Sequence, residues 1–204
     1  MFNQETLKRV LDISVSIVVT LSFLPFFLPI VVINSFFVGP GVFFIQERVG
    51  KDQKLFNLLK LRTMTSRENQ ASPIAKEQRW SHGDKSITRF GAFLRKYSID
   101  ELPSIINVLK GDMSLVGPRP LLREHISSYS TDDFVRHNVK PGLTGLAQIK
   151  GRNKLSWSMR YRYDRFYVSH RSFCMDVYIL LITLKVVIFK DGFDIGGDAV
   201  QMEK

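Results

Sequence analysis

The stretch ISVSIVVTLSFLPFFLPIVVINSFFVGPGVFFIQ, residues 13–46, decides the fold class, because it contains no charged side chain. About 20 helical residues cross the apolar core of a bilayer, so this stretch is long enough to enter a membrane. An ordinary spanning helix is one interpretation. A cleaved signal peptide fits less well, because no small-residue cleavage site follows and the apolar run continues.

Two features favour a broken helix that enters one leaflet and returns. Pro25 and Pro29 lie near the middle of the stretch, and each proline removes a helical N–H and clashes with an earlier carbonyl. Basic residues also flank the stretch on both sides, whereas a spanning helix usually has them on one side. They are Lys8 and Arg9 before it, and Arg48, Lys51, Lys54, Lys60 and Arg62 after it. We therefore expect a re-entrant helix-break-helix over residues 1–40, with both ends on one face of the membrane.

The composition indicates an anionic partner. The chain of 204 residues has 29 Lys and Arg against 19 Asp and Glu, a net charge of +10. Such an excess suits nucleic acid, lipid headgroups or phosphorylated substrates, and charge alone does not choose among them.

The single cysteine, Cys174, excludes an internal disulfide, and its apolar surroundings predict a buried thiol. The four histidines show no metal-ligand spacing, so no zinc site is predicted.

The pattern of apolar residues predicts a mainly α domain with a small β element. Residues 42–48 and 54–61 predict a strand, a turn, and a second strand or short helix. Helical periodicity over 87–97 predicts an amphipathic helix that either lies in the membrane surface or packs on the domain. A second amphipathic helix is predicted over 102–110, and an apolar core or interfacial helix over 173–190.

The remaining segments complete the domain organisation. Residues 66–85 are polar and predict a loop. Residues 160–167 interleave arginine with aromatic side chains, which suits nucleic acid or a membrane interface, and the neighbouring apolar stretch favours the interface. We expect a cytoplasmic catalytic domain over 41–191 and a variable tail over 192–204.

The run SIDELPSIINVLKGDMSLVGPRPLL, residues 98–122, carries the candidate chemistry. Asp100 and Glu101 fall at a predicted helix N-terminus, where acidic residues also occur for purely structural reasons. Arg119 lies between two prolines that limit its backbone freedom, and its guanidinium can hold phosphate oxygens bidentately. Phosphoryl transfer needs a nucleophile, a divalent cation and positive charge around the transferred group. A carboxylate can act as the nucleophile and as a ligand for Mg²⁺.

This run and VKPGLTGLAQIKGRN, residues 139–153, resemble the signature of the bacterial sugar transferase family, the small monotopic phosphoglycosyl transferases. The resemblance covers nearly the whole chain, from Lys8 to about Asp191. It implies the same re-entrant helix at the N-terminus. The family often has Ser immediately before the kink proline, whereas this chain has Leu24.

The resemblance also implies a role for each candidate site residue. Asp100 would attack the β-phosphate of a UDP-sugar and help bind Mg²⁺, and Glu101 would support the metal or proton transfers. Arg119 would hold the phosphate. The remaining candidates are Arg95 near the lipid headgroup, Lys60 close to the site, and Gln148 and Arg152 at the nucleotide or sugar.

The predicted function is transfer of a sugar 1-phosphate from a UDP-sugar to polyprenyl (undecaprenyl) phosphate, with release of UMP. The expected setting is the cytoplasmic face of a bacterial inner membrane, in contact with phospholipid and not with nucleic acid. Two rival interpretations stay open. One is a membrane glycosyltransferase that releases UDP, and the other is a membrane-tethered basic scaffold. No motif specifies the sugar or the oligomeric state.

Overall fold

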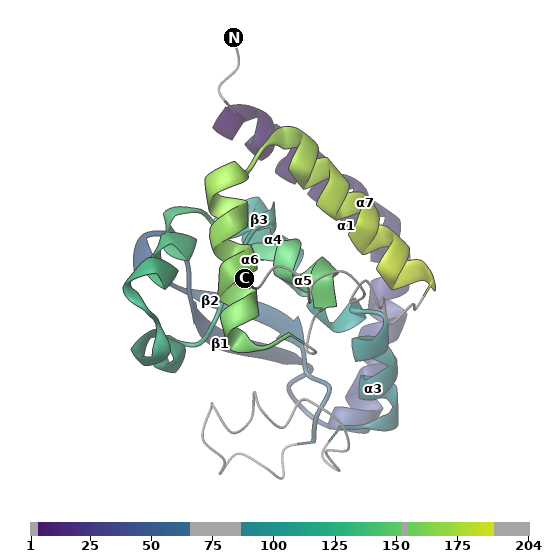
Figure 1. The fold of residues 1–204 in the computed structure, drawn as a ribbon. Helices are drawn as coiled ribbons and strands as arrows, with labels where there is room; N and C mark the ends of the chain where they lie inside the picture. Colours follow the sequence, from purple (N-terminus) through teal and green to yellow (C-terminus); the bar gives the residue numbers. More distant parts are fainter. Residues whose placement is uncertain (1–3, 66–86, 152–154, 190–204) are drawn as a thin grey trace.

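The computed structural model describes residues 4–65, 87–151 and 155–189 (Figure 1). The predicted loop 66–85, the tail 192–204 and the candidate residue Arg152 lie outside the described residues. Helices dominate the described chain, and its strands form two sheets of two strands each. The prediction of a mainly α fold with a small β element is therefore confirmed.

Helix α1, Gln4–Val38, contains the apolar stretch and is long and apolar enough to cross a membrane. It continues through Pro25 and Pro29, so the expected break into two helices at Pro25 is absent. Most of its large apolar side chains are exposed, while its buried residues include Asp12, Ser16 and Asn34. The helix thus turns polar side chains toward the protein and apolar ones outward, the reverse of a helix on a water-soluble domain.

A β-hairpin follows α1. Strand β1, Phe43–Val49, pairs antiparallel with β2, Leu55–Leu61, across the short helix η1, Lys51–Gln53. The second element of this predicted unit is therefore a strand and not a short helix. The turn itself places Asp52 and Gln53 at positive φ.

The segment with the acidic pair consists of three short helices: α3, Arg89–Lys96; η3, Ile99–Ser104; and α4, Ile105–Lys110. The predicted amphipathic helices are confirmed, but the second begins earlier and its first part is a 3₁₀-helix. Gly111 ends α4 with φ of 93°, the left-handed conformation that glycine adopts without steric cost.

The segment after Gly111 builds a second, parallel sheet and the remaining helices. Strand β3, Ser114–Val116, pairs with β4, Gly142–Thr144. A Cβ on Gly142 would lie 2.1 Å from the backbone nitrogen of Gly117, so the close approach beside this sheet requires glycine. The helical elements are η4, Arg123–Ser128; η5, Thr131–Asn138; α5, Leu146–Gly151; α6, Trp157–His170; and α7, Phe173–Phe189.

The hydrophobic core lies where β2, α4, the parallel sheet and the helices α5, α6 and α7 meet. Its buried apolar side chains are Leu58, Val108, Met113, Leu115, Val116, Val139, Leu146, Ile149, Tyr167 and Ile179. Figure 1 shows α7 running alongside α1. The expectation of a buried Cys174 was wrong, since its side chain is exposed. In the segment 160–167, Tyr161 and Tyr167 are buried in the domain, whereas Arg162 and Phe166 are exposed, so its placement at a membrane interface stays a prediction.

Candidate active site

Strand β2 is fastened to the helices that carry the acidic pair. The Ser104 hydroxyl donates to the carbonyl oxygen of Leu59 (2.6 Å). The Leu59 N–H donates to the Asn107 Oδ1 (3.1 Å), and the Asn107 Nδ2 donates to the carbonyl of Asn57 (2.8 Å). Since both polar groups of the Leu59 backbone are held in this way, the next residue, Lys60, is directed at the acidic pair.

Glu101 connects two cations that lie far apart in the sequence. Its Oε1 is 2.6 Å from the Lys60 Nζ and 3.3 Å from an Arg119 guanidinium nitrogen. The Lys60 side chain is 8% exposed, whereas the Arg119 side chain is 38% exposed. These three residues line one pocket together with Arg48, Leu58, Met113, Pro120, Gly142 and Leu143. The pocket is therefore lined by a buried lysine and a more accessible arginine, both paired with Glu101.

The two adjacent carboxyl groups have opposite pKa shifts. Burial, and then the charge of Glu101, raises the pKa of Asp100 to about 6, although Lys60 and Arg119 act in the other direction. Burial would also raise the pKa of Glu101, but the charges and hydrogen bonds of Lys60 and Arg119 outweigh it and lower the pKa to about 2. The pair thus consists of a Glu101 that is ionised at pH 7 and an Asp100 whose pKa is about 6.

Asp100 follows a strained backbone position. Ser98 has φ of 56°, in the left-handed region that non-glycine residues seldom adopt. The Glu101 N–H donates to the Ser98 carbonyl (3.2 Å), which closes the turn around Asp100. Nearby, the Arg95 Nε donates to the Thr63 hydroxyl (2.8 Å), and its charge lowers the pKa of Asp100. Strain of this kind occurs where a fold places a functional side chain.

The Pro118–Arg119–Pro120 turn is held by two buried arginines. An Arg136 guanidinium nitrogen donates to the Arg119 carbonyl (2.7 Å), and an Arg48 guanidinium nitrogen donates to the Pro120 carbonyl (3.2 Å). Arg136 is itself paired with Asp164 of α6 at 2.9 Å. The backbone of Arg119 is therefore fixed while its side chain stays partly accessible.

Comparison with known proteins shows the family to which this chain belongs. The family model described as "Bacterial sugar transferase" matches residues 3–190. The chain belongs to the bacterial sugar transferase family. It is therefore a transferase, as the sequence resemblance indicated.

Three relatives illustrate the range of this sugar transferase family. The transferase is 41% identical to "Uncharacterized sugar transferase EpsL" of Bacillus subtilis (strain 168), over 91% of this chain and 89% of that protein. It is 38% identical to "Undecaprenyl-phosphate galactose phosphotransferase" of Salmonella typhimurium, over 91% and 41%. It is 45% identical to "UDP-glucose:undecaprenyl-phosphate glucose-1-phosphate transferase" of Caulobacter vibrioides, over 71% and 54%. The transferase thus spans less than two thirds of the last two relatives.

Gln148 of the transferase lies in α5, beside the same turn but outside the pocket lining. Both polar atoms of its amide are buried, and neither has a hydrogen-bond partner among the described residues. A Cβ on Gly145 would lie 2.7 Å from the Gln148 Oε1 and 2.1 Å from the Gly117 carbonyl, which places the amide close to the start of the turn. Gln148 therefore keeps hydrogen-bonding capacity near the site.

The acidic pair has the right chemistry for Mg²⁺. Among the described residues, no group of three or more His, Cys, Asp and Glu side chains could hold a metal ion alone. Mg²⁺, however, commonly binds one or two carboxylates together with substrate phosphates and water. Asp100, whose carboxyl is not paired with Lys60 or Arg119, fits that role better than Glu101.

The structure brings Lys60, Glu101 and Arg119 together with Asp100, and it places Arg95 close enough for its charge to act on Asp100. Sequence reasoning missed the supporting roles of two residues. Arg48 was given no role at the turn, and Arg136 carried no signal, because its partner Asp164 lies on a distant helix that no local pattern connects to it.

Proposed function

We propose that this transferase moves a sugar 1-phosphate from a UDP-sugar to undecaprenyl phosphate, or a related polyprenyl phosphate, and releases UMP. The reaction would be the first membrane step in assembling a glycoconjugate. The names of the Salmonella and Caulobacter relatives describe the transfer of a sugar phosphate to undecaprenyl phosphate. The observation that carries the proposal is the Glu101–Lys60–Arg119 cluster that lines one pocket, with Asp100 next to Glu101 in the chain and close enough for the charges of all three to act on it.

In the first proposed step, an Asp100 oxygen attacks the β-phosphorus of the UDP-sugar. A bond forms between that oxygen and phosphorus, the bond to the bridging oxygen breaks, and UMP leaves with the bonding electrons. A pKa of about 6 leaves Asp100 mostly ionised at pH 7 and still basic for a carboxylate. In the second step, an oxygen of the lipid phosphate attacks the same phosphorus and restores the Asp100 carboxylate.

The remaining site residues have electrostatic roles in this mechanism. Arg119 would bind the transferred phosphoryl group, since part of its side chain is accessible. Lys60 keeps Glu101 ionised, and Glu101 in turn raises the pKa of Asp100. Mg²⁺, when bound by Asp100 and the substrate phosphates, would neutralise charge on the diphosphate. Arg95 would meet the lipid phosphate, and Gln148 and Arg152 would contact the nucleotide or sugar.

We further propose that α1 is re-entrant, bent at its two prolines without a break in the helix, and that the domain lies on the cytoplasmic face of the inner membrane. Both ends of the helix support this, because both are bonded to the same domain. Near its start, Arg9 donates to the Val108 carbonyl (2.6 Å). Near its end, the Asn34 Nδ2 donates to the Arg62 carbonyl (2.8 Å), and the Arg62 guanidinium donates to Val38. A straight spanning helix would separate these ends by the thickness of the bilayer.

Exposed aromatic side chains support a membrane surface around the end of α1. The Phe27 and Phe43 rings lie 6.4 Å apart, and the Phe37 and Phe90 rings 5.5 Å apart, so α1 contacts both the hairpin and α3. Neighbouring exposed apolar side chains in β1 and α3 are Phe44, Ile45 and Phe93. These elements would rest in the interfacial region of the bilayer.

The decisive experiment measures the nucleotide that leaves. Purified protein in lipid particles is mixed with Mg²⁺, undecaprenyl phosphate and a panel of UDP-sugars, and UMP and UDP are separated. UMP release by the wild type, and not by Asp100→Asn, supports the proposal. UDP release would instead identify a glycosyltransferase that transfers sugar alone, and it would overturn the proposed function.

A further inference from the structure

The start of α1 is bonded to the segment that joins the acidic pair to Arg119. Arg9 donates to the carbonyls of Val108 (2.6 Å) and Leu109 (2.8 Å), in the last turn of α4. Asp12 accepts a hydrogen bond from the Leu115 N–H (3.0 Å) in β3. Helix α4 follows the acidic pair and β3 precedes the turn that carries Arg119, so both neighbours of the site are attached to one short part of α1.

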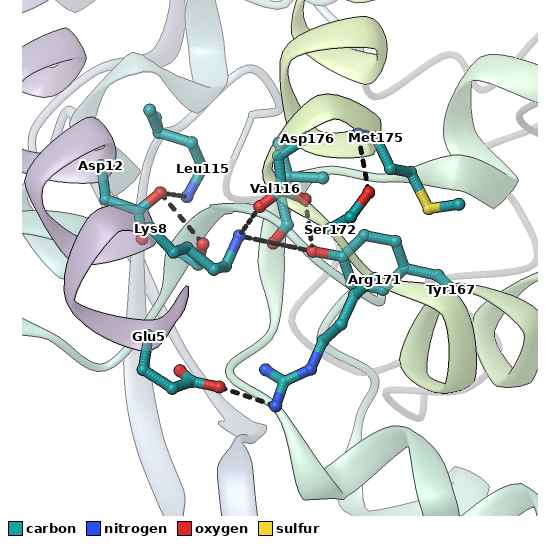
Figure 2. A network of polar contacts seen from close by, with 11 residues as sticks. Glu5, Lys8, Asp12, Leu115, Val116, Tyr167, Arg171, Ser172, Met175 and Asp176 are labelled. Carbon is teal, nitrogen blue, oxygen red and sulfur yellow. Dashed lines mark hydrogen bonds and ion pairs between the residues drawn. The ribbon is translucent and has the colours of Figure 1, made fainter. Parts of the chain in front are cut away.

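Lys8 makes the third attachment, and its ammonium group uses all three of its donors (Figure 2). It lies 2.6 Å from the Asp176 Oδ2, 3.0 Å from the Val116 carbonyl and 3.3 Å from the Tyr167 hydroxyl. The Tyr167 hydroxyl is in turn 2.7 Å from the Asp176 Oδ1 and 3.1 Å from the same Val116 carbonyl. Two side chains from different helices therefore meet at one backbone oxygen.

The Val116 carbonyl oxygen lies just before the Pro118–Arg119–Pro120 turn. Val116 ends β3, and the next residue, Gly117, donates its N–H to the carbonyl of Thr144 (2.9 Å) in the neighbouring strand β4. The backbone leading to Arg119 is thus held on one side by β4 and on the other by Lys8 and Tyr167. A change at Val116 reaches Arg119 within three residues.

The buried ion pair in this network indicates that the network positions the Val116 carbonyl more than it stabilises the fold. The Asp176 side chain is 3% exposed and the Lys8 side chain 17% exposed, so the ion pair is largely buried. A buried pair recovers little net stability, because desolvation opposes the attraction, and apolar side chains would often serve as well. What the pair supplies is a defined geometry for the groups around it.

We propose that Lys8, Tyr167 and Asp176 form a positioning triad that couples the seating of α1 in the membrane to the placement of Arg119. None of the three contacts the reacting atoms. When α1 is seated, Lys8 completes the triad and the Val116 carbonyl is fixed, which sets the turn for phosphate binding. This inference rests on the proposed function, because it assumes that Arg119 binds the transferred phosphoryl group.

The test is a double-mutant cycle on kcat/KM for UMP release by the full chain in lipid particles. Tyr167→Phe removes one hydroxyl and keeps the ring, and Tyr163→Phe, on the same helix, is the matched control. Each is made alone and together with Arg119→Lys. Asp176→Asn provides a second variant of the triad, and the thermal transition of every protein is recorded so that rates refer to folded protein.

If the triad acts through Arg119, Tyr167→Phe lowers kcat/KM about 10- to 100-fold in the wild-type background, as misplacement of a catalytic group does. In the Arg119→Lys background it lowers kcat/KM less than about twofold, because the two changes remove the same interaction. Asp176→Asn follows the same pattern. Equal losses in both backgrounds, or losses no larger than those of Tyr163→Phe, would overturn the triad alone. Absence of UMP release by the wild type with every donor would overturn the proposed function and the triad together.

Discussion

Lys60 and Glu101 form an ion pair at the pocket, with 2.6 Å between Nζ and Oε1, and this pair gives two adjacent carboxyl groups different ionisation behaviour. Because Lys60 and Arg119 both face Glu101, its negative charge is stabilised and its pKa falls to about 2. Asp100 shares the burial but not the direct contacts, so its pKa rises to about 6. The sequence neighbours are thus chemically distinct.

Asp100→Asn should abolish turnover while leaving the fold intact. The amide cannot attack phosphorus, and it is nearly the same size as the carboxyl, so we expect UMP release to fall at least about 1,000-fold. Asp112→Asn is the matched control, since Asp112 is exposed and, within the described part of the chain, its carboxylate accepts one long hydrogen bond (3.4 Å), from Asn107. Near-normal turnover by folded Asp100→Asn would refute its role as the nucleophile.

Arg119→Lys should be strongly impaired although it keeps the positive charge. A lysine ammonium cannot make the bidentate contact that a guanidinium makes with phosphate. We expect kcat/KM to fall about 100-fold, measured as UMP release over a range of UDP-sugar concentrations. Arg123→Lys, at an exposed position close by in the chain, should differ little from the wild type. Equal behaviour of the two variants would contradict the assignment of Arg119.

Turnover should fall on the acid side with the titration of Asp100. With a pKa of about 6, the carboxylate is present above that pH and becomes protonated below it, so kcat/KM decreases as the pH falls through about 6. Glu101→Gln removes a charge that raises this pKa. The residual activity of that variant should therefore show its acid limb at lower pH, and a shift toward higher pH would contradict the electrostatic argument.

Pro25→Ala with Pro29→Ala should allow α1 to straighten and populate a spanning form, because both helical N–H groups are restored. A Gln4→Cys label reports which side of the membrane the N-terminal end occupies. Cys174 is exposed, so the experiment needs a Cys174→Ser background. With the prolines present, only a reagent on the cytoplasmic side should label Gln4→Cys. With both prolines replaced, a fraction should react from the far side, and complete protection there would count against the prediction.

Some of the site could be predicted from the sequence because it lies in contiguous motifs. Asp100 and Glu101 are adjacent, and Arg119 follows in the same run, so local chemistry and the family resemblance named them together. The apolar stretch likewise marked α1, because hydropathy is a local property. The glycine at the end of α4 was predictable for the same reason, since a helix end depends on a few neighbouring residues.

Other parts depended on contacts between distant residues. The sequence did not show that Arg136 holds the Arg119 carbonyl, or that Lys8 reaches Val116, because each pair meets only after several elements have packed. The exposure of Cys174 was mispredicted for this reason. Composition describes a segment, whereas burial depends on what packs against it.

The sequence by itself determined the family, the mainly helical fold with an apolar N-terminal helix, and the identity of the acidic pair and the turn arginine. Only the tertiary structure decided how these groups differ in ionisation and what holds them in place. Electrostatic energy depends on distance and burial, and neither can be read from order along the chain. Lys60 affects Glu101 because β2 is bonded to Ser104 and Asn107, which places an ammonium 2.6 Å from one carboxylate and leaves the other to titrate near neutral pH.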